Sequence, residues 1–379
     1  MQQELIKKYL EGTATEEERT EVELWYASVQ LPFQQEQDQD TVRSRIYAKT
    51  NHLIASEPKV KRLSWLNWRL LSAAAAIVLI AGIVFVVFNN QHATQRNALL
   101  GNALFGTDIA PGGDQAILTL ADGRRISLDT AAEGKLAGLT GVQVSKTNGV
   151  VVYSPTSENA SSNKYNTLST PKGAKYELVL PDGSHVWLNA LSSIRYPEVF
   201  SASQRNVEVK GEAYFEVAHL QTKDKKSRIP FIVQAGDERI EVLGTHFNVR
   251  YYQGDPTQLT TLLEGAVKVS SHGKSVLLSP GEAAGTENGK PEIQKITDAN
   301  TELAVAWKEG EFQFEDASVP EIMNQIARWY DVEVIYQGEI PQEHFSGKVS
   351  RTENLSQVIE ILKRGGIRFK INERKITVY

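Results

Sequence analysis

The stretch VEVKGEAYFEV, Val207 to Val217, decides how most of this chain folds. Its odd positions are apolar except for Gly211, and its even positions carry glutamate, lysine or tyrosine. A period of two is typical of a β-strand with one buried face, not of a helix. We therefore predict a strand with a turn or bulge at Gly211, and we place Glu212 and Glu216 on its solvated face.

A helix over the same residues would have a different meaning. It would bring Glu212, Glu216 and His219 onto one face, as in helical metal sites. The period of two argues against this, because His219 falls on the face opposite Glu216 if the strand continues. No two of the seven histidines lie close enough in the sequence to form a local ligand pair. We expect no metal and no cofactor.

Short alternating stretches recur on both sides of this strand. LTLADGRRISLD (Leu118–Asp129) and LVLPDGSHVWLN (Leu178–Asn189) each read as a strand, an Asp-Gly turn and a second strand. Both therefore predict hairpins. Further stretches of this kind continue to about residue 300. We predict an all-β domain at residues 108–305.

The end of the chain mixes strands with helices. Ser318, Pro320 and Glu321 form the start signal of a helix, with a capping box, and Gly365 and Gly366 end a second helix. The order is strand, helix, two strands, helix, two strands. It predicts a small α+β domain at residues 306–379.

Residues before 108 have a different character. The run LLSAAAAIVLIAGIVFVVF, Leu70–Phe88, would span roughly 28 Å as a helix with a rise of ~1.5 Å per residue, which fits a bilayer. Basic residues gather before it, so residues 1–69 are expected in the cytoplasm and residues 89–379 outside. We predict one transmembrane helix at 70–88, a juxtamembrane linker at 89–107, and a single-pass protein of the inner membrane with its C-terminus in the periplasm.

Residues 1–69 show helical spacing of apolar side chains and a capping box at Thr15 and Glu18. Such short helices bury little apolar area, so this small all-α cytoplasmic domain should expose a face that fits a partner. The predicted fold class is therefore multi-domain: this all-α domain, one transmembrane helix, an all-β periplasmic domain and a C-terminal small α+β domain.

Composition excludes several functions. The net charge is -5, from 41 basic and 46 acidic residues, which argues against direct nucleic-acid binding. The chain has no cysteine, which excludes thiol catalysis and disulfides. It also has no nucleophile elbow, Walker loop or dinucleotide fingerprint, so we do not predict an ordinary enzyme.

One pair of residues leaves room for self-cleavage. In EVLGTHFNV, Gly244 and Thr245 interrupt two strands. A threonine hydroxyl can attack the preceding carbonyl and shift the acyl group from nitrogen to oxygen if the backbone is held strained. The alternative is a β-bulge, which the residues alone favour.

Together these stretches resemble the FecR-type anti-sigma factors common among Bacteroidetes. The resemblance rests on YLEGTATEEERTEVELWYA, the predicted membrane span, LVLPDGSHVWLNALSSIRYPEVF, VEVKGEAYFEVAH, EVLGTHFNVRYY, TLLEGAVKVS, LSPGEAA and WKEGEFQFEDASVPEIMNQIARWYDVEVIY. It implies that the cytoplasmic domain restrains an extracytoplasmic-function sigma factor. It also implies that the periplasmic part, ending in a secretin/TonB short N-terminal-like domain, receives a signal from the N-terminal signalling domain of an outer-membrane TonB-dependent transporter. Self-cleavage at the Gly-Thr pair is implied for some relatives.

The helical stripe of residues 1–69 supplies the expected sigma-factor contact, since a free stripe packs against partner helices. Its candidate residues are Leu10, Val22, Trp25 and Tyr26. The alternative is that these side chains pack only against one another.

Two other functions remain open from the residues. One is a membrane-anchored periplasmic protein that binds glycan or cell-wall material through exposed aromatic side chains, for which the candidates are Trp187, Tyr196 and Tyr214. The other is a membrane-bound hydrolase in which Glu212, Glu216 and His219 converge.

Overall fold

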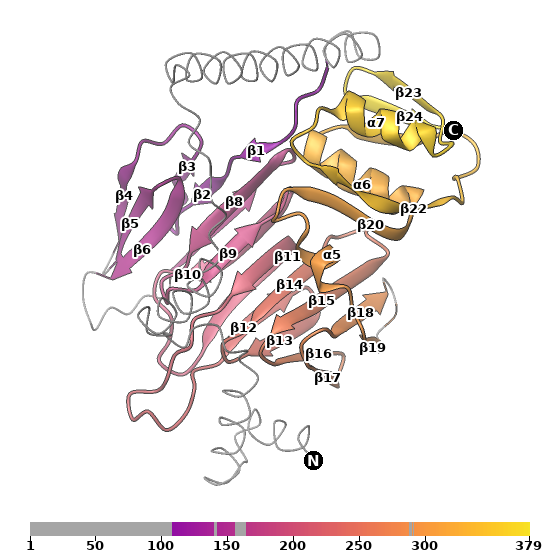
Figure 1. Ribbon diagram of the computed structural model, residues 1–379. Helices are drawn as coiled ribbons and strands as arrows, with labels where there is room; N and C mark the ends of the chain where they lie inside the picture. Colours follow the sequence, from indigo (N-terminus) through magenta and orange to yellow (C-terminus); the bar gives the residue numbers. More distant parts are fainter. Residues whose placement is uncertain (1–107, 140–141, 156–163, 288–289, 291) are drawn as a thin grey trace, which may run out of the picture. The chain divides into compact units, whose positions relative to one another are not determined.

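The computed structural model describes residues 108–139, 142–155, 164–287, 290 and 292–379, and all of them belong to one compact unit. They form 24 strands and three helices (Figure 1). Nineteen of these strands, β1 to β19, join into one hydrogen-bonded network. We call its residues, 108–296, the β domain, and residues 301–379 the C-terminal domain.

The network consists mainly of two sheets that share strand β11. Sheet 1 has the order β3-β2-β7-β10-β11-β12-β13-β16-β17, in which only β11 and β12 pair in parallel. Its strands are β2 (Ile117–Thr119), β3 (Arg125–Ser127), β7 (Tyr165–Thr170), β10 (Ser192–Pro197), β11 (Arg205–Glu216), β12 (Phe231–Ala235), β13 (Glu238–Val242), β16 (Val267–Ser271) and β17 (Lys274–Leu278).

Sheet 2 has the order β4-β5-β6-β8-β9-β11-β14-β15-β18-β19, and β1 pairs in parallel with β8. Its other strands are β1 (Gly113–Asp114), β4 (Gly134–Leu139), β5 (Val142–Thr147), β6 (Val150–Pro155), β8 (Ala174–Val179), β9 (His185–Leu188), β14 (His246–Tyr251), β15 (Thr257–Glu264), β18 (Ala283–Glu287) and β19 (Ile293–Ile296).

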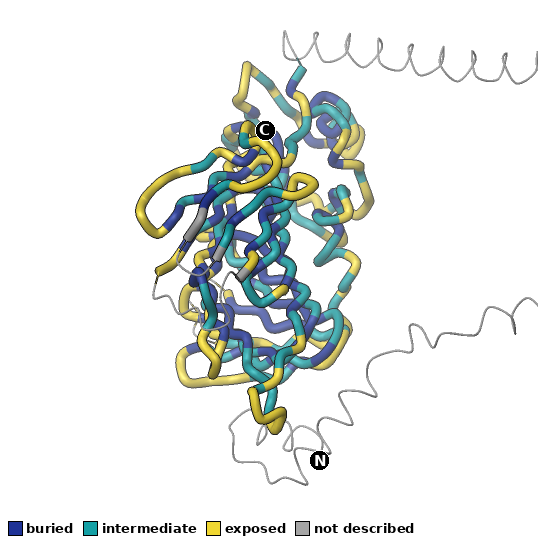
Figure 2. The backbone as a smooth tube through the Cα atoms, turned by 90° about the vertical axis from the view of Figure 1, so that its left-hand side faces the viewer, coloured by how far each residue is buried: buried dark blue, intermediate teal, exposed yellow. Residues whose placement is uncertain are grey.

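The core of the β domain lies between the two sheets. The ring of Phe215 lies 6.0 Å from that of Phe231 in sheet 1 and 4.9 Å from that of Phe247 in sheet 2, centroid to centroid. Across the same core the hydroxyls of Tyr153 and Tyr196 are 2.8 Å apart. Figure 2 shows buried residues along the strands and exposed residues at the turns. The apolar residues that alternate along the strands of both sheets thus point inwards and form one shared core between the sheets.

Strand β11 explains how two sheets can share one element. The predicted strand is confirmed, but it continues through Gly211 instead of turning there. Arg205–Lys210 pairs within sheet 1, and Gly211–Glu216 pairs within sheet 2. Gly211 has φ +84°, and a Cβ there would lie 2.4 Å from the Ser192 hydroxyl oxygen. The glycine therefore lets the strand pass from one sheet to the other.

Both predicted hairpins are confirmed. In β2 and β3, Leu118 lies opposite Ile126, and in β8 and β9, Leu178 lies opposite Val186. All four side chains belong to, or pack against, the core between the sheets.

The C-terminal domain has its own apolar core. Its elements are α5 (Thr301–Val305), β20 (Glu311–Ser318), α6 (Val319–Tyr330), β21 (Glu333–Tyr336), β22 (His344–Ser350), α7 (Leu355–Arg364), β23 (Phe369–Asn372) and β24 (Lys375–Val378). The predicted capping box of α6 is confirmed: Glu321 accepts hydrogen bonds from the backbone N–H and the hydroxyl of Ser318. Helices α6 and α7 bury apolar stripes in one cluster with Phe312.

The predicted fold class is wrong. The described residues are dominated by β-strands, and no helix among them is long and apolar enough to cross a membrane; the longest, α6, has 12 residues. The predicted all-α domain at 1–69, helix at 70–88 and linker at 89–107 lie outside the described residues. The helices were predicted from helical spacing in residues 1–69 and from the apolar run at 70–88, whereas the strands that dominate the described residues follow from period-two alternation.

Candidate functional site

The junction between the β domain and the C-terminal domain is built around Glu212 of β11. This side chain was predicted on a solvated face, which is wrong, because only 8% of Glu212 is exposed. Its carboxylate accepts hydrogen bonds from the side-chain amides of Asn189, at 2.7 Å, and Asn248, at 3.1 Å. A buried carboxylate needs such donors, since burial without them is costly.

The side-chain oxygens of Asn189 and Asn248 point towards the C-terminal domain. Asn189 Oδ1 accepts from Arg351 Nη1 at 2.9 Å, and Asn248 Oδ1 accepts from Trp307 Nε1 at 3.2 Å. We call Arg351, Asn189, Glu212, Asn248 and Trp307 the junction network. Its two ends belong to the C-terminal domain and its centre to the β domain, so a movement between the domains would break it.

Arg351 is the charged end of the junction network. Its guanidinium lies 4.7 Å from the ring centroid of Phe312 and 4.9 Å from that of Trp329, and only 3% of the residue is exposed. Burial lowers its pKa to about 10, and the charge of Glu212 acts in the opposite direction. The cation is therefore held by aromatic faces and by an amide oxygen.

A second contact joins α6 to the β domain. Arg328 forms an ion pair with Asp255 at 3.0 Å, and its guanidinium lies 3.9 Å from the ring centroid of Tyr252. The backbone carbonyl of Arg328 also accepts from the N–H of Gly173 at 2.8 Å. Neither side chain of this ion pair is more than 15% exposed, so solvent screens it less than a surface pair.

Gly244 and Thr245 lie where the chain passes from β13 in sheet 1 to β14 in sheet 2. Gly244 has φ +141°, and a Cβ there would lie 2.3 Å from Nδ1 of His219. Thr245 is buried, and its hydroxyl donates to the carbonyl of Ala266 at 3.1 Å. A register shift follows at His246. The site thus combines an irregular strand start with a backbone that only glycine can supply.

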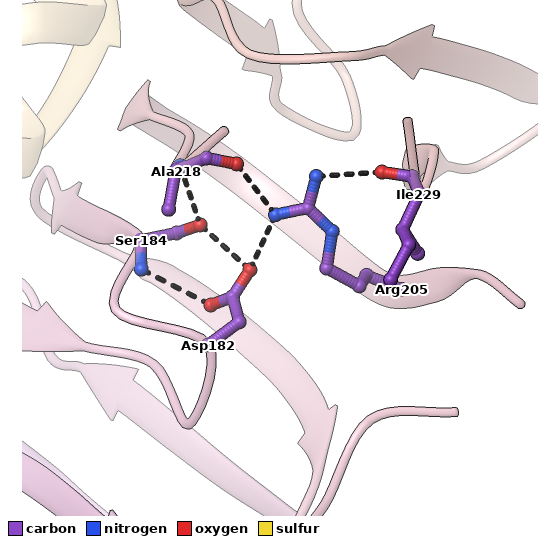
Figure 3. Close-up of polar contacts among 5 residues, drawn as sticks. All are labelled: Asp182, Ser184, Arg205, Ala218 and Ile229. Atoms are coloured by element: carbon purple, nitrogen blue, oxygen red, sulfur yellow. Dashed lines mark hydrogen bonds and ion pairs between the residues drawn. The ribbon is translucent and has the colours of Figure 1, made fainter. Parts of the chain in front are cut away.

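A buried ion pair between Arg205 and Asp182 also binds the backbone of Ala218 (Figure 3). Arg205 Nη1 donates to Asp182 and to the carbonyl of Ala218, each at 2.8 Å, and Nη2 donates to the carbonyl of Ile229 at the same distance. The side chains of Arg205 and Asp182 are 1% and 2% exposed. Because Ala218 precedes His219, this pair holds one side of the Gly244 contact in place.

The remaining predicted residues fall elsewhere. Leu10, Val22, Trp25 and Tyr26 lie outside the described residues. Glu216 is half-buried, and within the part of the chain that the structure describes no group of three His, Asp or Glu side chains could hold a metal ion.

The exposed aromatic side chains expected for glycan binding are not found as a set. Tyr196 is fully buried and Tyr214 is 5% exposed. Trp187 is half-buried, and Lys308 lies 4.7 Å from its ring centroid. The prediction that Tyr196 and Tyr214 are exposed is therefore wrong.

Sequence reasoning also missed the junction network. Its only local sign is the run of polar residues at even positions of β11, which are exposed in the first half of the strand and covered in the second. Asn189 and Arg351 are 162 residues apart, and no periodicity connects them.

Comparison with known proteins agrees with this division into two domains. Residues 166–268 match the family model described as FecR protein, and residues 311–378 match the one described as FecR, C-terminal. Two crystal structures, at 1.65 Å and 2.50 Å resolution, are described as a "putative anti-sigma factor" from Parabacteroides distasonis. They are 29% and 28% identical to this chain, cover 56% and 57% of it and 98% of their own chains, and have TM-scores of 0.51. None of the curated proteins compared with the chain matches it.

Proposed function

This chain belongs to the FecR-type anti-sigma factors, and from that premise we propose that it restrains an extracytoplasmic-function sigma factor until a signal arrives. One observation carries the proposal. The FecR region and the FecR C-terminal region occur on the same chain, and the junction network joins them. A receiving domain and a transmitting domain need such a connection.

We propose that Leu10, Val22, Trp25 and Tyr26 contact the sigma factor, which is supported by their helical spacing in the sequence. The test is affinity capture on the full chain in its native cells, followed by mass spectrometry. We expect a small sigma factor to be retained, and Trp25→Ala to lose it, while Tyr47→Ala retains it. Equal retention by both variants would contradict the assigned contact, and recovery of no sigma factor would contradict the function.

The signal, we propose, comes from the N-terminal signalling domain of an outer-membrane TonB-dependent transporter and enters through the C-terminal domain. The support is that polar contacts of Arg351, Arg328 and Trp307 tie this domain to the β domain. In a reporter strain, Arg351→Met should keep the sigma factor bound but lose most of the response to the transporter's substrate. A normal response would exclude the junction network from signalling.

For the location, we propose the periplasm for residues 89–379 and the cytoplasm for residues 1–69. The apolar run Leu70–Phe88 and the basic residues before it support this. Protease added to spheroplasts should digest the described residues and spare an N-terminal tag. Digestion of the tag, or protection of both ends, would contradict this location.

Self-cleavage at Gly244–Thr245 is a second proposal, supported by the φ of Gly244 and by its contact with His219. The Thr245 hydroxyl attacks the Gly244 carbonyl carbon, so that an ester bond forms as the peptide C–N bond breaks, and the hydroxyl proton passes to the freed amine. Water then hydrolyses the ester, leaving a carboxylate on Gly244 and the hydroxyl on Thr245.

Mass spectrometry of the purified protein tests this second proposal. We expect a fragment that begins at Thr245, absent from Thr245→Val and present in the control Thr261→Val. A single intact chain in the unmodified protein would refute self-cleavage without touching the sigma-factor proposal.

A further inference from the structure

A cavity of about 310 Å³ lies beside the junction network, between strands of sheet 2 and the first elements of the C-terminal domain. From the β domain it is lined by residues of β14, β15 and β18, and from the C-terminal domain by residues of α5, β20 and α6. This volume lies at the lower end of the range of ~300–1,000 Å³ typical of small-molecule sites. A ligand there would touch both domains.

Arg250 is the distinctive side chain of this cavity. It is half-buried, and its Nε atom is buried without a hydrogen-bond partner in the part of the chain that the structure describes. Among the described residues no carboxylate forms an ion pair with it: Asp255, which lies beside it in a smaller adjoining pocket, pairs with Arg328. An arginine that is partly desolvated and lacks a counter-ion favours an anionic ligand.

Five carboxylates line the same cavity and each has a partner; Asp316 lies 3.1 Å from Nδ1 of His344. Glu212 accepts from two amides, and Glu315 accepts from Asn300 at 2.6 Å. Glu311 lies 3.7 Å from the ammonium of Lys348, and Glu321 completes the capping box of α6. These contacts reduce the negative potential that an incoming anion would meet.

Two amides complete the polar lining. Gln313 of β20 and Gln325 of α6 are half-buried, and neither side chain makes a hydrogen bond within the described ranges. Each amide offers two donors and one acceptor oxygen, which suits hydroxyl groups. Leu259 and Leu303 add apolar wall that fits a carbon skeleton. Of the three arginines in the lining, Arg328 and Arg351 already have partners, so the lining offers one unpaired cation, two free amides and an apolar surface.

We propose that this cavity binds a small hydroxylated carboxylate of about the size of a sugar acid. Its carboxylate pairs with Arg250 in the two-pronged geometry that guanidinium groups favour, and its hydroxyl groups bond to Gln313 and Gln325. Such a ligand bridges the β domain and the C-terminal domain and stabilises their junction. This inference goes beyond the proposed function and does not depend on it.

Calorimetric titration of the full chain in detergent tests the inference with three probes, D-glucuronate, D-galacturonate and D-gluconate. We expect at least one to bind and to raise the melting temperature. D-Glucose, the neutral counterpart of D-glucuronate, should bind at least about tenfold more weakly, and sulfate should not replace the acid at equal concentration. Absence of binding by all three acids, or equal binding of glucose or sulfate, would overturn the proposal.

Variants locate the site. Arg250→Gln should weaken binding of the acid at least about tenfold, while Arg124→Gln, a change at an exposed turn, leaves it unchanged. Gln325→Glu places a negative charge in the lining and should weaken the acid more than glucose, which gives a second reading if Arg250→Gln folds poorly. Unchanged affinity for the acid in both cavity variants would refute the assignment. Retention of the sigma factor is not used as a readout, so failure here leaves the proposed function untouched.

Discussion

Two buried arginines of this protein are satisfied in different ways. Arg205, inside the β domain, donates directly to Asp182 and to two backbone carbonyls. Arg351, at the junction, forms no ion pair with any described carboxylate and reaches Glu212 only through the amide of Asn189. If the junction opens, Glu212 keeps both amide donors, whereas separating Arg205 from Asp182 would leave two buried charges without a counter-ion. The Arg205–Asp182 ion pair therefore stabilises the fold of the β domain, whereas the Arg351–Asn189 contact can break without unfolding it.

The largest expected effect comes from Arg205→Met. It leaves Asp182 buried without its cation and frees the carbonyls of Ala218 and Ile229. Removing one partner of a buried ion pair costs about 3–5 kcal/mol, so the free energy of unfolding should fall by that amount. Denaturant unfolding followed by tryptophan fluorescence measures it.

A surface pair provides the control. Arg124 Nε and Asp122 Oδ2 are 2.7 Å apart, and the two side chains are 59% and 51% exposed, so Arg124→Met should lower the free energy of unfolding far less than Arg205→Met does. Equal losses from Arg124→Met and Arg205→Met would show that burial is not what makes the Arg205 contact strong.

Arg351→Met should have a smaller effect, about 2–3 kcal/mol, because Glu212 retains its two amides while the methionine fills the space between Phe312 and Trp329. The same unfolding experiment measures it. Adding Glu212→Gln, which removes the unbalanced charge, should recover part of the loss. If Arg351→Met lowers the free energy of unfolding as much as Arg205→Met does, the junction contact is as essential to the fold as the ion pair inside the β domain.

Trp307→Phe probes the other end of the junction network. It keeps an aromatic ring but removes the N–H that donates to Asn248, which should cost about 1 kcal/mol. The matched control is Trp187→Phe, which loses no hydrogen bond to a described residue and should change stability by less than ~0.5 kcal/mol. If both variants lose the same amount, ring packing and not the hydrogen bond explains the effect.

The smallest effect is a pH dependence at His219, the neighbour of the segment that Arg205 holds. Partial burial, with the nearby Arg228 guanidinium, lowers the pKa of His219 below its usual value of 6.5. The unfolded chain then binds a proton more readily than the folded one, so this contribution to stability is complete above pH 6.5 and declines as the pH falls towards the folded-state pKa. His219→Gln should flatten this part of the stability profile, measured by denaturant unfolding at several pH values. An unchanged slope in His219→Gln would contradict the assignment.

Local signals predicted a good part of the described chain. The two Asp-Gly hairpins, strand β11 and the capping box of α6 follow from residues within a few positions of one another. Each depends on a backbone preference or a side-chain period that neighbours alone can set.

The junction could not be predicted in this way. The even face of β11 is exposed at Glu208 and Lys210 but buried at Glu212 and Tyr214, although the alternation is unbroken. What differs is the cover, which comes from Trp307 and other residues far along the chain. The contact of His219 with Gly244 is likewise set by the passage between two sheets and not by spacing.

The sharing of β11 by two sheets also has a consequence for the order of folding. This strand needs partners from both directions along the chain, β9 and β10 before it and β12 and β14 after it, and contacts between distant residues form slowly. A chain made from its N-terminus can complete these pairings before residues 301–379 arrive. Until then the side of β11 that bears Glu212 and Tyr214 remains exposed to solvent. The junction therefore forms last. A chain truncated before residue 301 would leave this face exposed, so it should be cleaved by proteases and aggregate more readily.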